Sequence, residues 1–257
     1  PKRKGDKMAR FFVDPSQIQD NYIQIVDQDV KHIRDVLRLE EGAQILICNG
    51  QGIDYKCIII DIDKQSIRGQ IIEKYFSKTE PQIKSTLFQS LIKGDKFEWV
   101  IQKAIEIGVS QIVPMISTNC VVKMESTKKM DTKLQRWNKI AESAAKQSGR
   151  GIIPQVLHPM HYINAVELCS QMDLAYIPYE KEDSLSLRTY IKQMKTKSIE
   201  TVGILIGPEG GFTQEEVQQA QTYKVQPVTL GTRILRSETA AVVSLSNTLY
   251  DMGEMEK

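Results

Sequence analysis

The sequence predicts an α/β protein in which a small β domain precedes a larger, mostly parallel sheet. Residues 9–77 contain short apolar runs with hairpin turn chemistry between them, which is typical of a small barrel of strands. From residue 85 onwards, apolar runs of strand length alternate with helical patterns, and this alternation is typical of a parallel sheet. A polar, proline-containing stretch at residues 75–84 separates the two parts. We therefore expect domains at residues 8–77 and 84–257.

The N-terminal domain is predicted to hold five strands and one helix. The helix covers residues 29–39, with Val30, Ile33 and either Val36 or Leu37 facing inward. The strand-like runs lie on both sides of it, at residues 11–13, 23–25, 44–47, 55–62 and 67–72. Residues 1–7 are basic and lack apolar content, so we expect them to take no part in the fold.

The C-terminal domain is predicted to alternate strands and helices to its end. Strands are expected at residues 85–92, 111–116, 174–178, 202–206 and 225–230. Helices are expected from residue 94 to Gly108 and at residues 132–147, 162–171 and 184–195. Thr213 with Glu216 forms a capping-box pattern that starts a further helix. In the last helix, one apolar stripe is expected to face inward, formed by Val242, Leu245, Leu249 and Met252.

Two of the predicted strands end in glycine loops, at residues 207–211 (GPEGG) and at Gly231. We expect these strands to be adjacent, so that both loops lie at the carboxyl edge of the sheet, where α/β proteins bind ligands. A phosphate cradle is a weak interpretation, because no GK[ST] or GxGxxG motif is present and Glu209 would repel a phosphate. A backbone-lined slot with one carboxylate better suits a neutral ring that carries a cationic group. The plain alternative is a pair of ordinary strand-to-helix turns.

Charge and cysteine usage add weaker signals. Net charge is only +2, but residues 80–150 hold 12 Lys or Arg against 7 Asp or Glu, and residues 199–257 hold 4 against 8. A basic middle beside an acidic end suits a polyanion track that leads to a small-molecule pocket, although two solvated surfaces explain it equally well. The four cysteines and three histidines form no metal or disulfide pattern, so we expect no metal and a reducing cytoplasm. No apolar run approaches transmembrane length, so we expect no membrane partner.

The segments ILIGPEGGFT (residues 204–213) and LGTRILRSETA (residues 230–240) resemble the signature of the ribosomal RNA small-subunit uridine-N3 methyltransferases. These enzymes belong to the SPOUT class of methyltransferases, and the resemblance extends over nearly the whole chain from Met8. It implies a PUA-like RNA-binding barrel, a SPOUT-type domain with a C-terminal trefoil knot, and a homodimer. It also implies the cofactor S-adenosylmethionine and a substrate that is 16S ribosomal RNA, free or in the assembled small subunit.

The resemblance places the cofactor between the two glycine loops. Arg236 is expected to stabilise charge on the uracil oxygens, with Glu238 orienting it and Glu209 removing the proton or holding its loop. A surface ion-pair network at a helix start is the plain alternative for Arg236 and Glu238. The expected cofactor-binding residues are Leu205, Gly207, Pro208, Glu209, Gly210, Gly211, Leu230, Gly231, Ile234, Leu235, Arg236, Thr239 and Ala240.

The expected RNA-binding residues are basic and scattered along the chain. Those of the barrel lie on one predicted helix, where a solvated helix face explains them as well. Arg150, in the family-like motif QSGR, is expected to reach a phosphate, or else to pair with the end of the helix before it. The full set is His32, Arg34, Arg38, Lys93, Arg150 and Arg233.

Three functions are compatible with these patterns. The first is transfer of a methyl group from S-adenosylmethionine to N3 of a uridine in small-subunit ribosomal RNA. The second is a non-catalytic RNA-binding factor that acts in ribosome assembly. The third is a nucleotide-dependent enzyme that uses the GPEGG loop, and the missing Lys and Ser/Thr phosphate ligands count against it.

Overall fold

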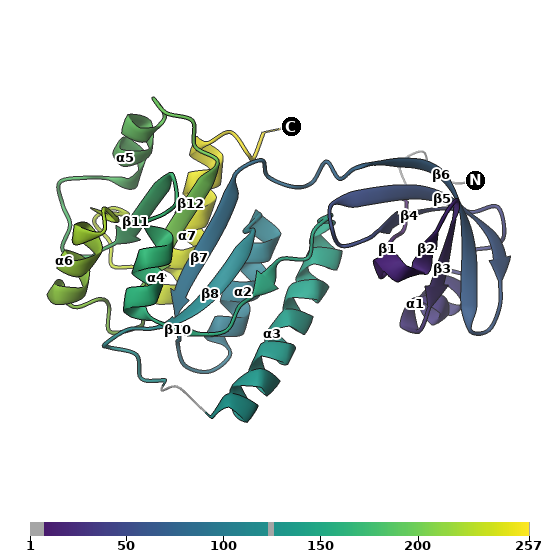
Figure 1. The fold of residues 1–257 in the computed structure, drawn as a ribbon, viewed down its shortest axis with the longest axis horizontal. Helices are drawn as coiled ribbons and strands as arrows, with labels where there is room; N and C mark the ends of the chain where they lie inside the picture. The colour runs from purple at the N-terminus through teal and green to yellow at the C-terminus, as the bar shows by residue number, and fades with distance from the viewer. Residues whose placement is uncertain (1–7, 123–125, 257) are drawn as a thin grey trace. The chain divides into compact units, whose positions relative to one another are not determined.

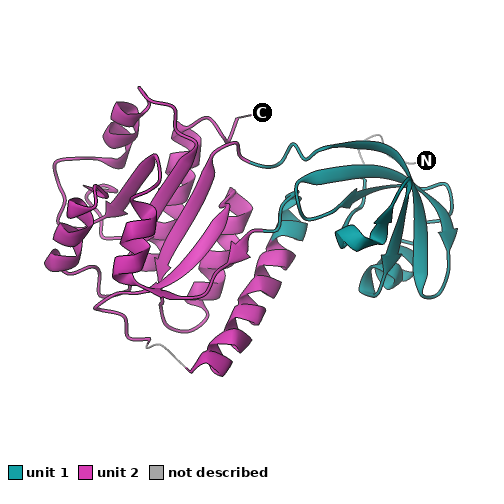
Figure 2. Cartoon of the chain, viewed as in Figure 1, with its two compact units in different colours: residues 1–80, 145–153 teal, residues 81–144, 154–257 magenta. Residues whose placement is uncertain are grey.

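A computed structural model describes residues 8–122 and 126–256 of the chain. The chain divides into two compact units (Figure 2). Unit 1 comprises residues 1–80 and 145–153, and unit 2 comprises residues 81–144 and 154–257. The division after Glu80 falls within the expected linker, but the return of residues 145–153 to unit 1 was not expected. The basic stretch at residues 1–7 lies outside the described residues. Within the described ranges, no helix combines the length and the apolar character that a membrane span requires.

The described residues of unit 1 form a curled six-stranded sheet with strand order β1-β4-β5-β6-β3-β2. β1 pairs with β4 in parallel, and the other neighbours are antiparallel. Apolar side chains from alternate positions of these strands fill one core, as the period of a strand requires. The expected five strands are all present, and β2 is an addition. The strands are β1 (Arg10–Phe12), β2 (Ile18–Gln19), β3 (Tyr22–Val26), β4 (Gln44–Cys48), β5 (Ile53–Ile62) and β6 (Ser66–Phe76).

The predicted helix of unit 1 is shorter and less regular than expected. It consists of α1 (Gln28–Lys31) followed by a π-helical turn, His32–Val36, that is closed by the bond from the Leu37 N–H to the His32 carbonyl at 2.9 Å. Val30 and Ile33 are buried as predicted, but Val36 is 68% exposed and Leu37 is 38% exposed. The prediction that one of these two faces inward was wrong, because a π turn contains more residues than the α turn on which the 3.6-residue period depends.

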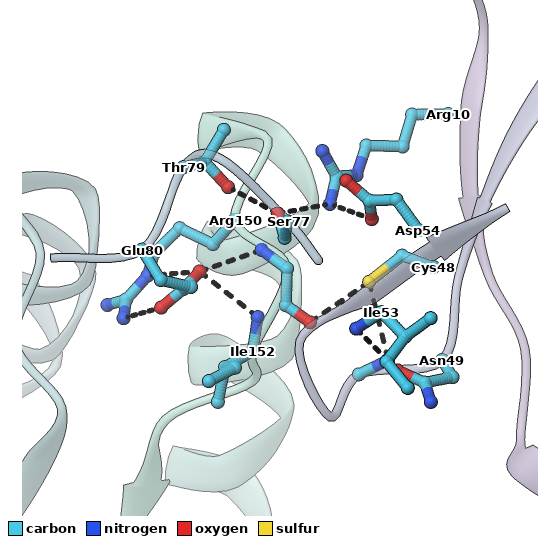
Figure 3. A network of polar contacts seen from close by, with 12 residues as sticks. Arg10, Cys48, Asn49, Ile53, Asp54, Ser77, Thr79, Glu80, Arg150 and Ile152 are labelled. Atoms are coloured by element: carbon cyan, nitrogen blue, oxygen red, sulfur yellow. Dashed lines mark hydrogen bonds and ion pairs between the residues drawn. The ribbon is translucent and has the colours of Figure 1, made fainter. Parts of the chain in front are cut away.

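Residues 145–153 complete unit 1 from a distant part of the sequence. The Gly52 N–H donates to the Gly151 carbonyl at 2.9 Å, and the Cys48 thiol donates to the same carbonyl at 3.0 Å. The Glu80 carboxylate binds the Arg150 guanidinium at 2.5 Å and accepts the Gly151 N–H at 2.7 Å (Figure 3). The segment of residues 145–153 is therefore hydrogen-bonded to the sheet through its backbone, and it is bound by the carboxylate of Glu80.

Arg150 is only 4% exposed in this arrangement, and its guanidinium is engaged by Glu80. This geometry argues against the expected phosphate contact, because a phosphate would have to replace a buried carboxylate. Burial raises the pKa of Glu80, but the hydrogen bond and charge of Arg150 and two backbone N–H groups outweigh it, so the net pKa is lowered. Arg150 is thus a structural residue of unit 1.

The described residues of unit 2 form a seven-stranded parallel sheet with order β10-β8-β7-β12-β11-β13, and β9 pairs with β8. Helix α4 covers one face, and α2 and α7 cover the other (Figure 1). The strands are β7 (Lys84–Ser90), β8 (Gln111–Ile116), β9 (Gln155–Val156), β10 (Met160–His161), β11 (Leu174–Pro178), β12 (Thr201–Ile206) and β13 (Gln226–Val228). The helices are α2 (Lys96–Ile107), α3 (Thr127–Ser148), α4 (Tyr162–Cys169), α5 (Leu187–Met194), α6 (Gln214–Thr222) and α7 (Ser237–Asp251).

The expectation that the two glycine-loop strands are neighbours was wrong, because β11 lies between β12 and β13. All three strands run in the same direction, so their carboxyl ends still meet at one edge. The predicted capping box of α6 is confirmed: Thr213 accepts the Glu216 N–H at 3.2 Å, and Glu216 accepts the Thr213 N–H at 2.9 Å. The Glu216 carboxylate also accepts the Thr118 N–H at 2.7 Å, which fastens the loop after β8 to α6.

The buried face of α7 is partly polar. Leu245 and Leu249 are buried as predicted, whereas Val242 and Met252 are only half-buried. Ser244 and Thr248 are also buried. The hydroxyl of the fully buried Tyr176 lies 2.8 Å from the Thr248 hydroxyl and donates to the backbone carbonyl of Ser244 at 3.1 Å. A buried phenol needs such partners, so the helix offers hydrogen-bonding groups where an apolar stripe was expected.

Replacing Glu80 with Gln is expected to destabilise unit 1 by roughly 3 kcal/mol at pH 7, because it leaves the buried Arg150 charge without its counter-ion. Glu80 has a lowered folded-state pKa, so its contribution is complete above its ordinary value of 4.5 and is lost as the pH falls through the folded-state value. The difference between wild type and E80Q should therefore shrink below about pH 4.5.

Urea titrations followed by circular dichroism measure this difference. Both tryptophans, Trp99 and Trp137, lie in unit 2, so their fluorescence cannot follow the unfolding of unit 1. Hydrogen exchange of residues 44–62 is therefore used to assign the transition to unit 1. Glu98→Gln is the matched control: its Arg136 partner is 65% exposed, so the change should cost less than about 1 kcal/mol. Equal effects of E80Q and E98Q would contradict the structural role assigned to Glu80.

Candidate functional site

A cavity of about 440 Å³ opens at the carboxyl edge of the unit 2 sheet. Its walls are the loops that follow β11, β12 and β13, together with the start of α7 and the side chain of Lys96. This is the position where open α/β sheets bind ligands, and the volume lies within the ~300–1,000 Å³ of small-molecule sites. The two glycine loops therefore share one cavity, as the sequence predicted, even though β11 separates their strands.

Most of the residues predicted to bind a cofactor line this cavity. They are Gly207, Pro208, Glu209, Gly211, Leu230, Gly231, Ile234, Leu235, Arg236 and Ala240. Leu205, Gly210 and Thr239 are not among the lining residues. Leu205 is completely buried in the core of the sheet, and a side chain at Gly210 would meet Asn119 at 3.1 Å. Gly210 therefore permits packing of two loops, which was not the role predicted for it.

One complete wall of the cavity was not predicted from the sequence. Pro178 ends β11, Tyr179 and Glu180 follow it, and all three line the cavity. The strand itself was predicted, but its position between β12 and β13 depends on pairing over more than 20 residues of sequence, which local periodicity does not encode. Lys96 was also missed as a cavity residue, because it comes from the start of α2, far earlier in the chain.

A chain of hydrogen bonds joins the first glycine loop to the start of α7. The Gln89 side-chain amide donates to the Ser237 hydroxyl at 2.9 Å, and that hydroxyl donates to the Gly207 carbonyl at 2.5 Å. Gln89 is completely buried at the end of β7, and Ser237 is the first residue of α7. The first glycine loop is thus joined to the helix that the second loop enters. A glycine suits position 231 because its φ of +113° is one that other residues rarely adopt.

The GPEGG loop is also held from its outer side. The Lys93 backbone N–H donates to the Glu209 carboxylate at 3.0 Å, and the Asn119 amide donates to the Gly210 and Gly211 carbonyls at 3.1 Å each. Of the two roles predicted for Glu209, this geometry supports the holding of the loop. It also gives Lys93 a backbone contact beside the cavity, while its side chain is exposed.

Three basic side chains, Lys96, Arg233 and Arg236, line the cavity. Arg233 and Arg236 are exposed, and neither forms an ion pair within the described ranges. Glu238 was expected to orient Arg236, but its carboxylate lies 3.1 Å from the Lys96 ammonium and outside the cavity lining. This pairing corrects the predicted partner.

Burial raises the pKa of Glu238, but a hydrogen bond from its own backbone N–H, the hydrogen bond of Lys96 and the nearby charges of Lys96 and Arg236 outweigh it, so the net pKa is lowered. A carboxylate with a lowered pKa that is already paired is poorly suited to remove a proton near neutral pH. Glu238 is therefore unsuited to act as a base.

Three of the basic residues predicted to bind RNA follow β3: His32 and Arg34 lie on the π-helical turn, and Arg38 lies two residues after its end. His32 and Arg38 are exposed. The Arg34 guanidinium pairs with the neighbouring Asp35 carboxylate at 2.7 Å, and its side chain keeps 35% of its surface exposed. All three are therefore accessible to a polyanion, and Arg34 is partly neutralised.

The chemistry of the cavity fits a flat, partly charged ligand. Residues of both glycine loops line it together with the apolar residues Ile206 and Leu235, and the acidic residues Glu180 and Glu209 are also among its lining residues. No group of three potential metal ligands occurs in residues 8–122 and 126–256. The cavity thus offers surfaces for a ring and acceptors for a cationic group, as the two loops predicted.

Comparison with protein families defines the class. The family model of an RNA methyltransferase domain matches residues 78–249, and that of an RNA methyltransferase PUA domain matches residues 25–72. The chain is therefore built as an RNA methyltransferase, with its PUA domain in unit 1 and its methyltransferase domain, which contains the cavity, extending over most of unit 2.

Individual relatives define the family. The ribosomal RNA small subunit methyltransferase E of Bacillus subtilis is 34% identical, with 95% of this chain and 96% of the relative covered. Its counterpart in Mesomycoplasma hyopneumoniae is 35% identical, covering 95% and 100%. The Neisseria gonorrhoeae enzyme of the same name, solved with bound S-adenosylmethionine, matches with a TM-score of 0.80 at 30% identity, covering 95% and 98%. The chain belongs to the ribosomal RNA small subunit methyltransferase E family, which confirms the resemblance found in the sequence.

Proposed function

We propose that this protein transfers a methyl group from S-adenosylmethionine to N3 of a uridine in 16S ribosomal RNA. The observation that supports this most directly is the single cavity formed by the two glycine loops, in a chain that matches the S-adenosylmethionine-bound Neisseria enzyme over 95% of its length. The alternative, a non-catalytic RNA-binding factor, would give no reason for an open cavity at the ligand-binding edge of the sheet.

The residues of this chain fit the cofactor. The backbone from Leu230 to Leu235 would form one wall for the adenine ring, and Gly207 to Gly211 would form the other. Glu180 and Glu209 supply negative charge at the cavity edge, which suits the positive charges of the cofactor. When bound, S-adenosylmethionine supplies an electrophilic methyl group on a sulfonium.

The main task of the protein in this reaction is to align the uridine and stabilise charge. The N3 nitrogen of uracil carries a proton, and its loss moves negative charge onto the two carbonyl oxygens of the ring. Arg236 lines the cavity and forms no ion pair in the part of the chain that the structure describes, so its guanidinium is available to those oxygens. Arg233, three residues earlier in the same loop and exposed, would contact RNA beside the target base.

The substrate also bears on the location and assembly of the protein. An enzyme that modifies bacterial small-subunit RNA acts in the cytoplasm, where that RNA is assembled. We further infer a homodimer, because α7 leaves Ala240, Val242 and Val243 only half-buried, and Ala240 also lines the cavity. Sedimentation velocity at micromolar concentration checks this inference, and a purely monomeric distribution would contradict it.

The proposed reaction is tested by incubating 16S RNA, both free and in small subunits, with the protein and S-adenosylmethionine labelled on its methyl group. Nucleoside mass spectrometry should then detect 3-methyluridine. A parallel calorimetric titration with S-adenosylmethionine separates the two candidate functions, since a protein that only binds RNA should show no heat.

Arg236→Ala is expected to reduce methyl transfer by about 10²-fold or more, because one donor to the developing oxyanion is lost. The affinity for S-adenosylmethionine should stay within about three-fold, since the backbone of the two loops still forms the walls. Single-turnover assays and calorimetry measure the two quantities. An unchanged rate would remove Arg236 from the mechanism.

Arg34→Ala combined with Arg38→Ala is expected to weaken RNA binding and to reduce the salt dependence of the binding constant by about one to two units of slope. Filter binding at several salt concentrations measures both. Arg188→Ala combined with Lys192→Ala on α5 removes the same charge from another surface and serves as the control. Equal losses of RNA affinity in the two double variants would show that the effect depends on net charge alone.

A further inference from the structure

Lys96 occupies a position that ordinary helix energetics disfavours. It is the first residue of α2, where the helix dipole presents partial positive charge to a side chain that is itself positive. Its ammonium nevertheless lies 3.1 Å from the Glu238 carboxylate in the first turn of α7, where an acidic residue is favourable. The N-termini of α2 and α7 thus supply the two partners of one ion pair, which fixes the position of the Lys96 ammonium.

That place is the wall of the cavity. Lys96 is a lining residue and its side chain remains 40% exposed, whereas Glu238 lies behind it with 15% of its side chain exposed. An ammonium has three donors, and the carboxylate of Glu238 takes one of them. Donors of Lys96 therefore remain available on the cavity side.

The other charged groups around the cavity do not duplicate this one. Arg233 and Arg236 come from the loop after β13, and both are exposed. Glu180 follows β11, and Glu209 is engaged by the backbone of Lys93. Lys96 alone among the cations lining the cavity in the described ranges is positioned by an ion pair, so it is the one with a preorganised charge.

We propose that Lys96, positioned by Glu238, donates a hydrogen bond to a carbonyl oxygen of the target uracil and stabilises the negative charge that develops there. This inference rests on the proposed function. In the reaction, the N3–H bond breaks and its proton leaves to water. The electron pair forms the N3–CH3 bond, and the S–CH3 bond breaks with its electrons remaining on sulfur. Lys96 is then a catalytic residue, and Glu238 is a positioning residue that acts through it.

The first test is Lys96→Met, which keeps the length and apolar stem of the side chain and removes the charge. The kcat is expected to fall by about 10²-fold, while KM for RNA and the affinity for S-adenosylmethionine change by less than about three-fold. The pH at which kcat stops rising should be higher than in wild type, because ionisation of the bound uracil has lost its nearby cation. Lys96→Arg, which keeps a cation, should recover part of the rate.

The second test is the double-mutant cycle with Glu238→Gln. The single change should lower kcat by about ten-fold, and K96M/E238Q should be no slower than K96M, because a residue that acts only through Lys96 has nothing left to position. Lys103→Met is the matched control: it lies on the same helix, pairs with Glu106 at 2.9 Å and is not among the cavity lining residues. Its kcat should match wild type.

Three outcomes would overturn the inference. A K96M variant with normal kcat and a lower melting temperature would make the ion pair structural. A rise in KM for RNA with a flatter salt dependence and unchanged kcat would make Lys96 a phosphate contact. Additive losses in K96M and E238Q would show that Glu238 acts independently. Wild-type turnover in the same assays supports the proposed function by itself, so each of these outcomes counts against Lys96 only.

Discussion

The buried hydrogen bonds of Ser237 are the constraint on which the site depends. The hydroxyl accepts a hydrogen bond from the Gln89 side-chain amide and donates one to the Gly207 carbonyl. One small side chain thus connects β7, the loop after β12 and the start of α7. Because Gln89 and Ser237 are nearly inaccessible to water, a lost bond between them would leave an unpaired polar atom in the interior. The conformation of the loop that lines the cavity is thus stabilised by hydrogen bonds to buried side chains at the edge of the sheet.

The parts of the fold that could be predicted from the sequence are those that local patterns encode. Strand-length apolar runs, the Thr213 capping box and the glycine bends after Ile206 and Leu230 all lie where the sequence placed them. The predictions that failed concern irregular local structure or long-range strand pairing. The π turn at His32–Val36 breaks the helical period, and the insertion of β11 between β12 and β13 is a property of strand pairing. The C-terminal knot stays a prediction from the family resemblance.

The same distinction applies to the site. Residues on the two glycine loops could be predicted because one contiguous motif carries each of them, and the family resemblance named their role. Lys96 and the Tyr179–Glu180 wall could not, because each reaches the cavity from an element that the motifs do not contain. Arg150 shows the opposite error: a glycine-flanked arginine is typical of a mobile contact, and only its burial against Glu80 reveals a structural ion pair. Charge and spacing do not report burial.

The return of residues 145–153 to unit 1 has a consequence for the order in which the protein can be made. The Glu80 carboxylate accepts a hydrogen bond from the Ile152 N–H, 72 positions further along the chain. A nascent polypeptide that ends at Glu80 therefore does not yet contain the donors that bind this carboxylate in the folded protein. Synthesis proceeds from the N-terminus, and a domain usually folds as it emerges. Here the first unit to emerge is completed only after much of the second has been translated. The completion of unit 1 therefore depends on residues that are translated after the first part of unit 2.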